Sequence, residues 1–327
     1  MERQLLGLLI KINPGIFLNI NKEDQMYVVT GATGKTGRLV TESLLAKGNE
    51  VRAIGRNADH LRPLIEKGAE AFVGSVSESA AMLEAFQGAK AVYLMIPPNY
   101  GTEDPRGYQN EVGRAYVNAI HRTGIAYAVN LSSIGAQLSK GTGPISGLHD
   151  VEQRLNQLRD LNIVHLRAAF FMENLLSSIP LIQSRNIIGM PIRKDLRIPM
   201  IDTRDIAEVA AQLLLRLDFS GKSSRELLGA ADISMEEATQ IIGRSIGKND
   251  LSYVQFTYEQ AEQAMRSMGM SQAVARSIGE MSRAFNEKRV HPLEKRKAEN
   301  TTPTSFEQFA AGFAEIYRAQ ERIHPAA

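Results

Sequence analysis

The fold of this chain is decided by one stretch of its sequence, Val28-Val29-Thr30-Gly31-Ala32-Thr33-Gly34-Lys35-Thr36-Gly37. A β-prone apolar run ends at Thr30, and apolar side chains recur at helical spacing after Gly37. Gly31 permits a tight turn, Gly34 lets backbone approach a pyrophosphate, and Gly37 lets the helix pack close to the strand. Free N–H groups and the helix dipole then favour negative charge at the helix start. The stretch therefore predicts a dinucleotide-binding turn between a strand and a helix.

An alternative for the same stretch is a triphosphate-binding P-loop, because Gly34-Lys35-Thr36 resembles the end of that motif. The P-loop also requires a glycine five residues before Gly34, and this chain has Val29 there. Val29 belongs to the strand, so we reject the triphosphatase interpretation.

Strand and helix patterns alternate along the chain after the glycine turn. This alternation predicts an α/β fold: a Rossmann-type, doubly wound parallel sheet with crossover helices. From Ser234 onward the segments are amphipathic helices, which predicts a smaller, mainly helical C-terminal substrate lobe. Strands are expected at 26–30, 51–54, 71–73, 91–96, 125–131, 163–166 and 225–228, and helices at 57–65, 78–86, 109–123, 149–159 and 205–217.

This pattern predicts that the chain is divided into three parts. We expect residues 1–25 to be an N-terminal extension, because a polar stretch separates them from the first strand. Residues 26–170 and 200–230 are expected to form the NAD(P)-binding domain. Residues 171–199 and 231–327 are expected to form the lobe for a substrate or partner.

The composition excludes several kinds of site. The chain has no cysteine, which excludes disulfides, thiol nucleophiles and zinc-thiolate centres. Its six histidines form no pair with helical ligand spacing, so no metal site is expected. Lys and Arg number 38 and Asp and Glu 36, a balance that gives no support for a nucleic-acid surface. No apolar run approaches the ~20 residues of a membrane span, and no secretory signal is expected, so the expected location is cytoplasmic.

The residue after the second strand bears on the choice of dinucleotide. NAD binders usually carry a carboxylate there for the ribose 2′-hydroxyl, whereas this chain has Arg56 and no acid beside it. A guanidinium binds a 2′-phosphate through charge-assisted hydrogen bonds. We therefore expect NADP(H) as the cofactor, with NAD(H) as an alternative if Arg56 is only a solvated loop cation.

The glycine stretch resembles the opening of the NmrA-like group of atypical short-chain dehydrogenases/reductases. Further matches are Arg56, Met95-Ile96-Pro97-Pro98, Leu131-Ser132-Ser133, Leu166-Arg167, Phe170-Phe171-Met172-Glu173-Asn174, and Ile201-Asp202 with Asp205-Ile206-Ala207. The resemblance implies an NADP(H)-binding fold with a smaller lobe over the nicotinamide end. It also implies either a reductase, often of quinones or other small carbonyl compounds, or a redox sensor.

The resemblance assigns cofactor contacts residue by residue. It places Arg56 at the 2′-phosphate. Related proteins often have Asp after the glycine of the third strand to meet the adenine, and here Ser75 follows Gly74, which departs from that pattern. The remaining implied contacts are Thr33, Gly34, Lys35 and Thr36 around the phosphates, Met95, Ile96 and Pro97 along the adenine-side ribose, and Ser132, Ser133 and the Ala168–Phe171 loop with Phe170 beside the nicotinamide. Gly31 and Gly37 complete the cofactor-binding turn.

The catalytic apparatus departs from the wider superfamily. Its reductases use a Tyr with a Lys four residues on, and this chain has no Tyr between Tyr127 and Tyr253. Ser133 is expected at the family's serine position. His149, at the start of the following helix, is either a proton donor or a histidine with a structural hydrogen bond.

Two functions are consistent with these residues. The first is a reductase that passes hydride to a small-molecule electron acceptor, a quinone or carbonyl compound, without a Tyr-Lys pair. The second is a non-catalytic NADP(H) sensor that acts on a regulatory protein partner, and a homodimer fits either function. We expect an enzyme, an NAD(P)H-dependent oxidoreductase.

Overall fold

The computed structural model describes residues 26–323, so the N-terminal extension proposed for residues 1–25 lies outside the described part. A seven-stranded parallel sheet forms one half of the molecule, with the strand order β10-β6-β5-β4-β1-β2-β3. Its strands are β1 (Met26–Val29), β2 (Val51–Gly55), β3 (Glu70–Val73), β4 (Ala89–Leu94), β5 (Tyr127–Ser133), β6 (Asn162–Ala168) and β10 (Lys222–Leu227).

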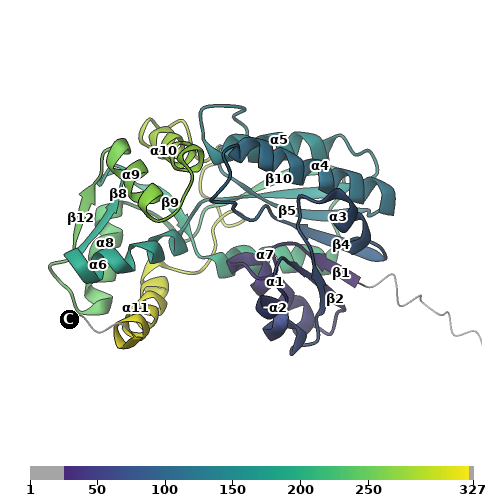
Figure 1. The fold of residues 1–327 in the computed structure, drawn as a ribbon, viewed down its shortest axis with the longest axis horizontal. Coiled ribbons are helices and arrows are strands. Elements are labelled where there is room, and N and C mark those ends of the chain that lie inside the picture. Colours follow the sequence, from purple (N-terminus) through teal and green to yellow (C-terminus); the bar gives the residue numbers. More distant parts are fainter. Residues whose placement is uncertain (1–25, 324–327) are drawn as a thin grey trace, which may run out of the picture.

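Helices cover both faces of this sheet (Figure 1). Apolar side chains of α1, α2 and α7 join one buried cluster, and those of α3, α4 and α5 join the other. The strand order reverses at β1, which lies between β4 and β2, and ligands of such sheets bind at this switch point. This confirms the predicted Rossmann-type architecture. The helices are α1 (Lys35–Ala46), α2 (Ala58–Ile65), α3 (Ser79–Ala85), α4 (Pro105–Thr123), α5 (Pro144–Asn156) and α7 (Thr203–Arg216).

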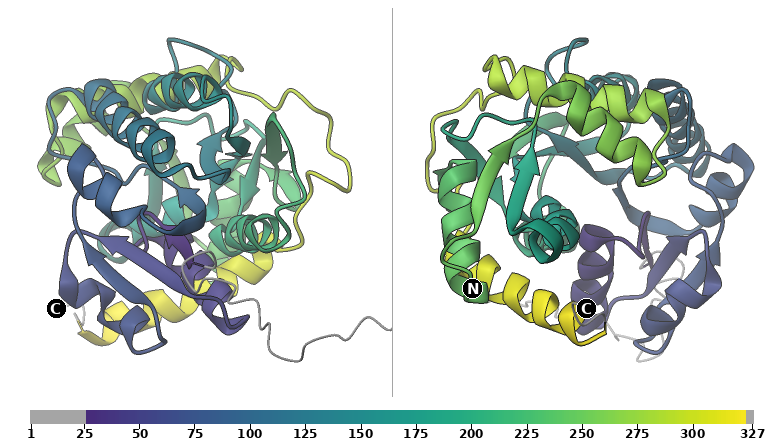
Figure 2. Two further views of the ribbon diagram at one scale, coloured as in Figure 1. Left: turned by 90° about the vertical axis from the view of Figure 1, so that its right-hand side faces the viewer. Right: turned by 60° about the vertical axis from the view of Figure 1, so that its left-hand side comes forward.

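The other half of the molecule is the lobe, which is mainly helical as expected (Figures 1 and 2). Two small sheets that the sequence pattern did not predict strengthen it, one with the order β11-β9-β7 and one pairing β12 with β8. The lobe elements are β7 (Phe170–Phe171), the 3-10 helix η2 (Met172–Ser178), α6 (Ile179–Arg185), β8 (Ile187–Met190), β9 (Ile198–Ile201), β11 (Ala231–Ile233), α8 (Met235–Ile246), β12 (Ser252–Gln255), α9 (Tyr258–Ser267), α10 (Gln272–Asn286) and α11 (Phe306–Ile323).

One helix boundary differs from the prediction in a way that matters for the site. The helix expected to begin at His149 begins at Pro144, which places His149 in its second turn. Gly143, the residue before it, has φ +58°, and a Cβ there would lie 1.9 Å from the carbonyl oxygen of Ser277 in α10. A contact with the lobe therefore shapes this helix start, and local sequence does not reveal it.

Within residues 26–323, no helix combines the length and the apolar character that crossing a membrane requires. The same residues contain no group of three or more His, Asp or Glu side chains arranged to hold a metal ion.

Candidate cofactor and acceptor site

The glycine turn joins β1 to α1 with backbone packed against backbone. Gly31 has φ +62°, and a Cβ there would lie 2.1 Å from the sulfur of Met95. A Cβ on Gly37 would lie 2.3 Å from the carbonyl oxygen of Gly31. Gly34 is the N-cap of α1 and supplies no side-chain cap, so the first N–H groups of the helix keep no side-chain partner at the cap. Such a helix start fits a pyrophosphate.

Buried hydroxyl groups fix the ends of β1 and β4 on either side of the switch point. Thr30 Oγ1 accepts the N–H of Met95 at 2.8 Å and donates to the carbonyl of Tyr93 at 3.1 Å. Tyr116 of α4 donates its hydroxyl to the carbonyl of Met95 at 2.6 Å. These bonds hold the backbone of Met95, from which Ile96 and Pro97 follow. No sequence motif pointed to Thr30 or Tyr116 in this role.

Lys35, the first residue of α1, reaches from the glycine turn to the lobe. Its Nζ donates to the backbone carbonyl of Glu173 in η2 at 3.0 Å. Desolvation of the ammonium lowers the pKa of Lys35, and the nearby Glu173 carboxylate partly offsets this. The contact places a cation between the helix start and the lobe.

Glu173 itself ties η2 to α7. Its Oε1 accepts the N–H of Thr203 at 2.8 Å and also the Thr203 hydroxyl. Its Oε2 is buried and has no hydrogen-bond partner among residues 26–323. Burial raises the pKa of the Glu173 carboxyl, and the Thr203 bonds act in the opposite direction.

A second part of the site lies at the ends of β2 and β3. Arg56, directly after β2, is exposed and lines a cavity of about 280 Å³. The other lining residues come from the end of β3, the loop after β4 and the start of α4: Ser75, Ser77, Asn99, Thr102, Asp104, Gly107, Tyr108 and Glu111.

The two serines at the end of β5 have protein partners. Ser132 is buried and donates to Oε1 of Glu152 at 2.6 Å, and the guanidinium of Arg167 also binds that carboxylate, at 2.6 and 3.1 Å. Ser133 donates to the carbonyl of Ile134 at 2.9 Å. The structure therefore brings Ser132 into an ion-pair cluster of Glu152 and Arg167, which no local sequence signal predicts.

His149 lies in the second turn of α5. Its Nδ1 is 2.8 Å from the carbonyl oxygen of Ala136, so Nδ1–H donates to that carbonyl. A structural hydrogen bond of this kind was one of the two roles expected for His149, the other being proton donation. The bond occupies Nδ1 and does not involve Nε2.

Phe170 marks the border between the sheet and the lobe. Its ring is 6% exposed and meets the ring of Phe285 in α10 edge-on, with centroids 6.4 Å apart.

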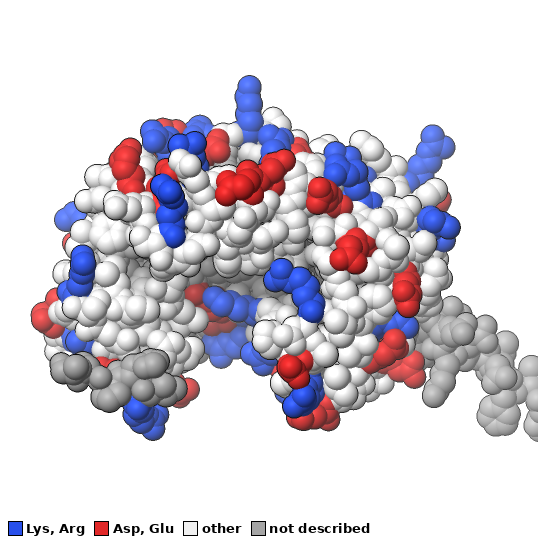
Figure 3. Space-filling model, viewed as in Figure 1, with Lys and Arg blue, Asp and Glu red and all other residues white. Residues whose placement is uncertain are grey.

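The face of the molecule drawn in Figure 3 is hollowed between the lobe and the part carrying α1 and α2, with basic side chains inside the hollow. Such a hollow suits an anionic ligand.

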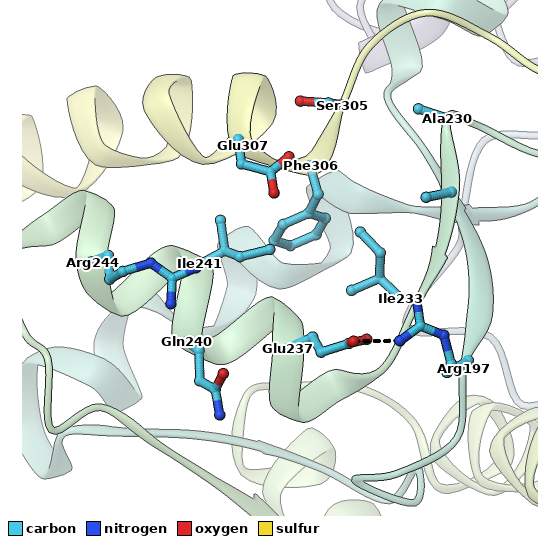
Figure 4. A pocket seen from close by; sticks show the side chains of 11 residues that line it. Arg197, Ala230, Ile233, Glu237, Gln240, Ile241, Arg244, Ser305, Phe306 and Glu307 are labelled. Atoms are coloured by element: carbon cyan, nitrogen blue, oxygen red, sulfur yellow. Dashed lines mark hydrogen bonds and ion pairs between the residues drawn. The ribbon is translucent and has the colours of Figure 1, made fainter.

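A further cavity, of about 290 Å³, lies wholly within the lobe between β11, α8 and the start of α11 (Figure 4). Phe306 and Ile233 point into it, and the guanidinium of Arg197 at its edge is paired with Glu237. None of the site residues expected from the sequence lines it.

Known proteins resemble this chain over most of its length. The chain is 26% identical to the NAD(P)H azoreductase of Xenophilus azovorans over 258 residues, which cover 78% of this chain and 86% of that protein. It is 24% identical to quinone oxidoreductase 2 of Escherichia coli K12, over 76% of this chain and 84% of that protein.

Solved structures share the fold. The Escherichia coli NADPH-dependent quinone oxidoreductase in complex with NADPH superimposes with a TM-score of 0.65 at 21% identity, covering 90% of this chain and 99% of that one. The Citrobacter sp. triphenylmethane reductase in complex with NADP(H) gives 0.71 at 18% identity, covering 88% and 99%. The family model described as the NmrA-like family matches residues 23–310, and the chain therefore belongs to the NmrA-like family.

Proposed function

We propose that this protein is an NADP(H)-dependent oxidoreductase that reduces a small quinone or other electron-poor acceptor by hydride transfer. The observation that carries the proposal is the pairing of an uncapped helix start at the switch point with Arg56 in a cavity at the neighbouring strand end. Residues 26–170 and 200–230 would bind the cofactor, and the lobe would cover the acceptor. The names of the azoreductase and quinone oxidoreductase relatives support this assignment.

The residues of the glycine turn fit a dinucleotide. Gly31 and Gly37 leave no room for a Cβ, so the turn stays close to the helix start where N–H groups can meet a pyrophosphate. Thr33, Gly34, Lys35 and Thr36 would surround the phosphates. When bound, the nicotinamide supplies the hydride, and the protein contributes binding, orientation and charge.

We choose a quinone-like acceptor because the two candidate proton donors, Ser133 and His149, are hydrogen-bonded to backbone carbonyls. Ser133 donates to the Ile134 carbonyl, and His149 donates through Nδ1 to the Ala136 carbonyl. An acceptor that is already electrophilic needs little help from a protein acid, so this arrangement suits quinones better than simple ketones.

An anaerobic screen of NADPH oxidation against quinones, azo dyes and enones tests the proposal. We expect turnover with at least one quinone or azo dye, at rates that saturate with the acceptor. Arg56→Glu should raise KM for NADPH by at least about tenfold, because a carboxylate repels the 2′-phosphate. An NADPH-binding protein without turnover on any acceptor would contradict the reductase assignment.

The engaged state of Ser133 and His149 also favours a second function, a non-catalytic NADP(H) sensor. A sensor would bind NADPH tightly, and none of the acceptors in the screen would support NADPH oxidation. Cofactor binding would instead change the affinity of the sensor for a protein partner. The same screen therefore separates the two functions.

A further inference from the structure

Glu173, the second residue of η2, lies where two helices of the large-sheet half begin. Helices α1 and α7 pack side by side, and they begin at Lys35 and Thr203. The Lys35 ammonium donates to the backbone carbonyl of Glu173 at 3.0 Å, and the Thr203 N–H donates to the Glu173 carboxylate at 2.8 Å. One residue of the lobe therefore contacts both helix starts.

The two carboxylate oxygens of Glu173 have different surroundings. Oε1 accepts both the N–H and the hydroxyl of Thr203. Oε2 is buried and has no hydrogen-bond partner among residues 26–323. Burying a charged oxygen without a partner is unfavourable, and protonation removes that charge. Oε2 is therefore the oxygen at which a proton would bind.

The charged groups around Glu173 act on it in both directions. Asp202, the buried N-cap of α7, raises the pKa of Glu173 beyond the effect of burial, whereas the Thr203 bonds lower it. The Glu173 carboxylate favours the charged forms of Lys35 and Arg204, so these cations favour the carboxylate in return. Helices α6 and α11 and strand β8 also pack on η2, but the charged residues of α6 and α11 are exposed and β8 has none.

A bound dinucleotide would change this balance. Its pyrophosphate carries two negative charges, and the proposed function puts it at the start of α1, beside the Lys35 ammonium. The pyrophosphate would compete with the Glu173 carboxylate for that ammonium. It would also add like charge near the carboxylate, and both effects favour the protonated form of Glu173.

We infer that cofactor binding is coupled to the uptake of a proton from solvent by Glu173 Oε2, which makes cofactor affinity depend on pH. The inference rests on the proposed binding of NADP(H) and adds a linked reaction to it. The proton returns to solvent when the cofactor leaves. Because the complex binds the proton more tightly than the free protein does, affinity falls as pH rises from the pKa of Glu173 in the free protein to its higher pKa in the complex.

Calorimetry of NADPH binding in buffers of different ionisation enthalpy counts the protons taken up. The 2′-phosphate also titrates near neutral pH, so each measurement is compared with Glu173→Gln, which keeps the side-chain shape and takes up no proton. If binding raises the pKa of Glu173 by about 1, wild-type protein should take up about half a proton more than the variant at the pH midway between the two pKa values. Glu208→Gln, at an exposed position of α7, is the matched control and should behave as wild type.

The pH dependence of Kd separates this coupling from a purely structural role of Glu173. Below both pKa values, wild type and Glu173→Gln should bind NADPH with similar Kd. Above both, wild type should bind up to about tenfold more weakly, because only wild type then keeps a carboxylate near the pyrophosphate. A variant that had only lost structural contacts would bind more weakly than wild type at every pH.

Thr203→Val provides a second test if Glu173→Gln does not fold. It removes the hydroxyl that donates to Oε1 and lowers the pKa of Glu173, so the pH of maximal proton uptake should move upwards. The inference is overturned if Glu173→Gln takes up as many protons as wild type at every pH from about 5 to about 9, or if Thr203→Val leaves the maximum in place. A protein that binds neither NADPH nor NADH contradicts the proposed function, and the inference with it.

Discussion

Glu152 holds a buried charge beside the strand end that carries Ser132 and Ser133. Its side chain is 1% exposed, and its carboxylate binds both the Ser132 hydroxyl and the guanidinium of Arg167, whose side chain is 13% exposed. The hydrogen bonds with Glu152 raise the pKa of Arg167 above its usual range, although burial acts against this. The cation therefore stays charged, and it depends on Glu152 for compensation.

Glu152→Ala should lower the free energy of unfolding by about 3 kcal/mol, because it removes the buried carboxylate that pairs with the largely buried guanidinium of Arg167. Urea unfolding at neutral pH measures this. Asp59→Asn breaks an exposed ion pair with Arg62 and should cost less than about 1 kcal/mol. Equal losses for the two variants would contradict the compensating role of Glu152.

His165 makes stability depend on pH. Burial lowers its pKa from 6.5 to about 4, with Glu152 opposing this shift and Arg167 adding to it. The neutral ring accepts from the Asn130 amide at 3.0 Å, and its Nε2–H donates to Asn156 at 3.0 Å. Because the unfolded state binds the proton more tightly, this stability is present above pH 6.5 and is lost as pH falls towards 4.

The expected loss between these two pH values is up to about 3 kcal/mol, measured by urea unfolding at both. His165→Gln should remove this part of the pH dependence while it lowers stability at pH 7. A variant that keeps the wild-type slope would show that other groups cause it.

At the scale of elements, the close approach of α1 to its own preceding turn sets the helix start that we propose binds the cofactor phosphates. Gly37→Ala places a Cβ 2.3 Å from the Gly31 carbonyl oxygen, so the helix start must move. We expect Kd for NADPH to rise at least about tenfold, together with a lower melting temperature. Gly312→Ala is the control, because a Cβ in that open helical position meets nothing within 4 Å and should stabilise by up to ~1 kcal/mol.

The elements that the sequence predicted are those whose signals are local. The β1–α1 turn has its glycines in place, and Arg56 could be named because it follows a recognisable strand. The pairing of β8 with β12 joins residues 187–190 to residues 252–255, and no periodicity in either short segment reveals a partner so far away. The positions of Tyr108 and Glu111 at the cavity could not be predicted for a related reason. Helical spacing does not show which face of α4 lies over a cavity.

At the scale of the whole molecule, contacts of α10 join the lobe to the half that carries the large sheet and to β7 at the border between the two halves. The N–H and hydroxyl of Ser271, at the start of α10, donate to the carbonyls of Tyr100 and Thr102 at 2.8 and 2.5 Å. Phe285, at the other end of α10, packs on Phe170. Helix α10 thus connects the loop beside the Arg56 cavity with Phe170 at the border between the sheet and the lobe.

Lys35 is the third connection, and it starts from the glycine turn itself. A bound pyrophosphate would lie beside its ammonium, which the Glu173 carbonyl already holds towards the lobe. Lys35→Met keeps the side-chain length and removes the charge, so we expect the cofactor to leave about tenfold faster, with a smaller effect on association. Stopped-flow measurement of NADPH fluorescence gives both rates.

The effect of Lys35→Met should be the same for NADPH and NADH, because the two share the pyrophosphate and differ only at the 2′-position. This equality separates Lys35 from Arg56, whose replacement should affect NADPH alone. Arg38→Met removes a cation from the exposed face of the same helix, where Arg38 pairs with Glu42, and should leave both release rates unchanged. Unchanged release from the Lys35→Met protein would show that the contact with Glu173 only joins the lobe to the turn, and that the helix start alone holds the pyrophosphate.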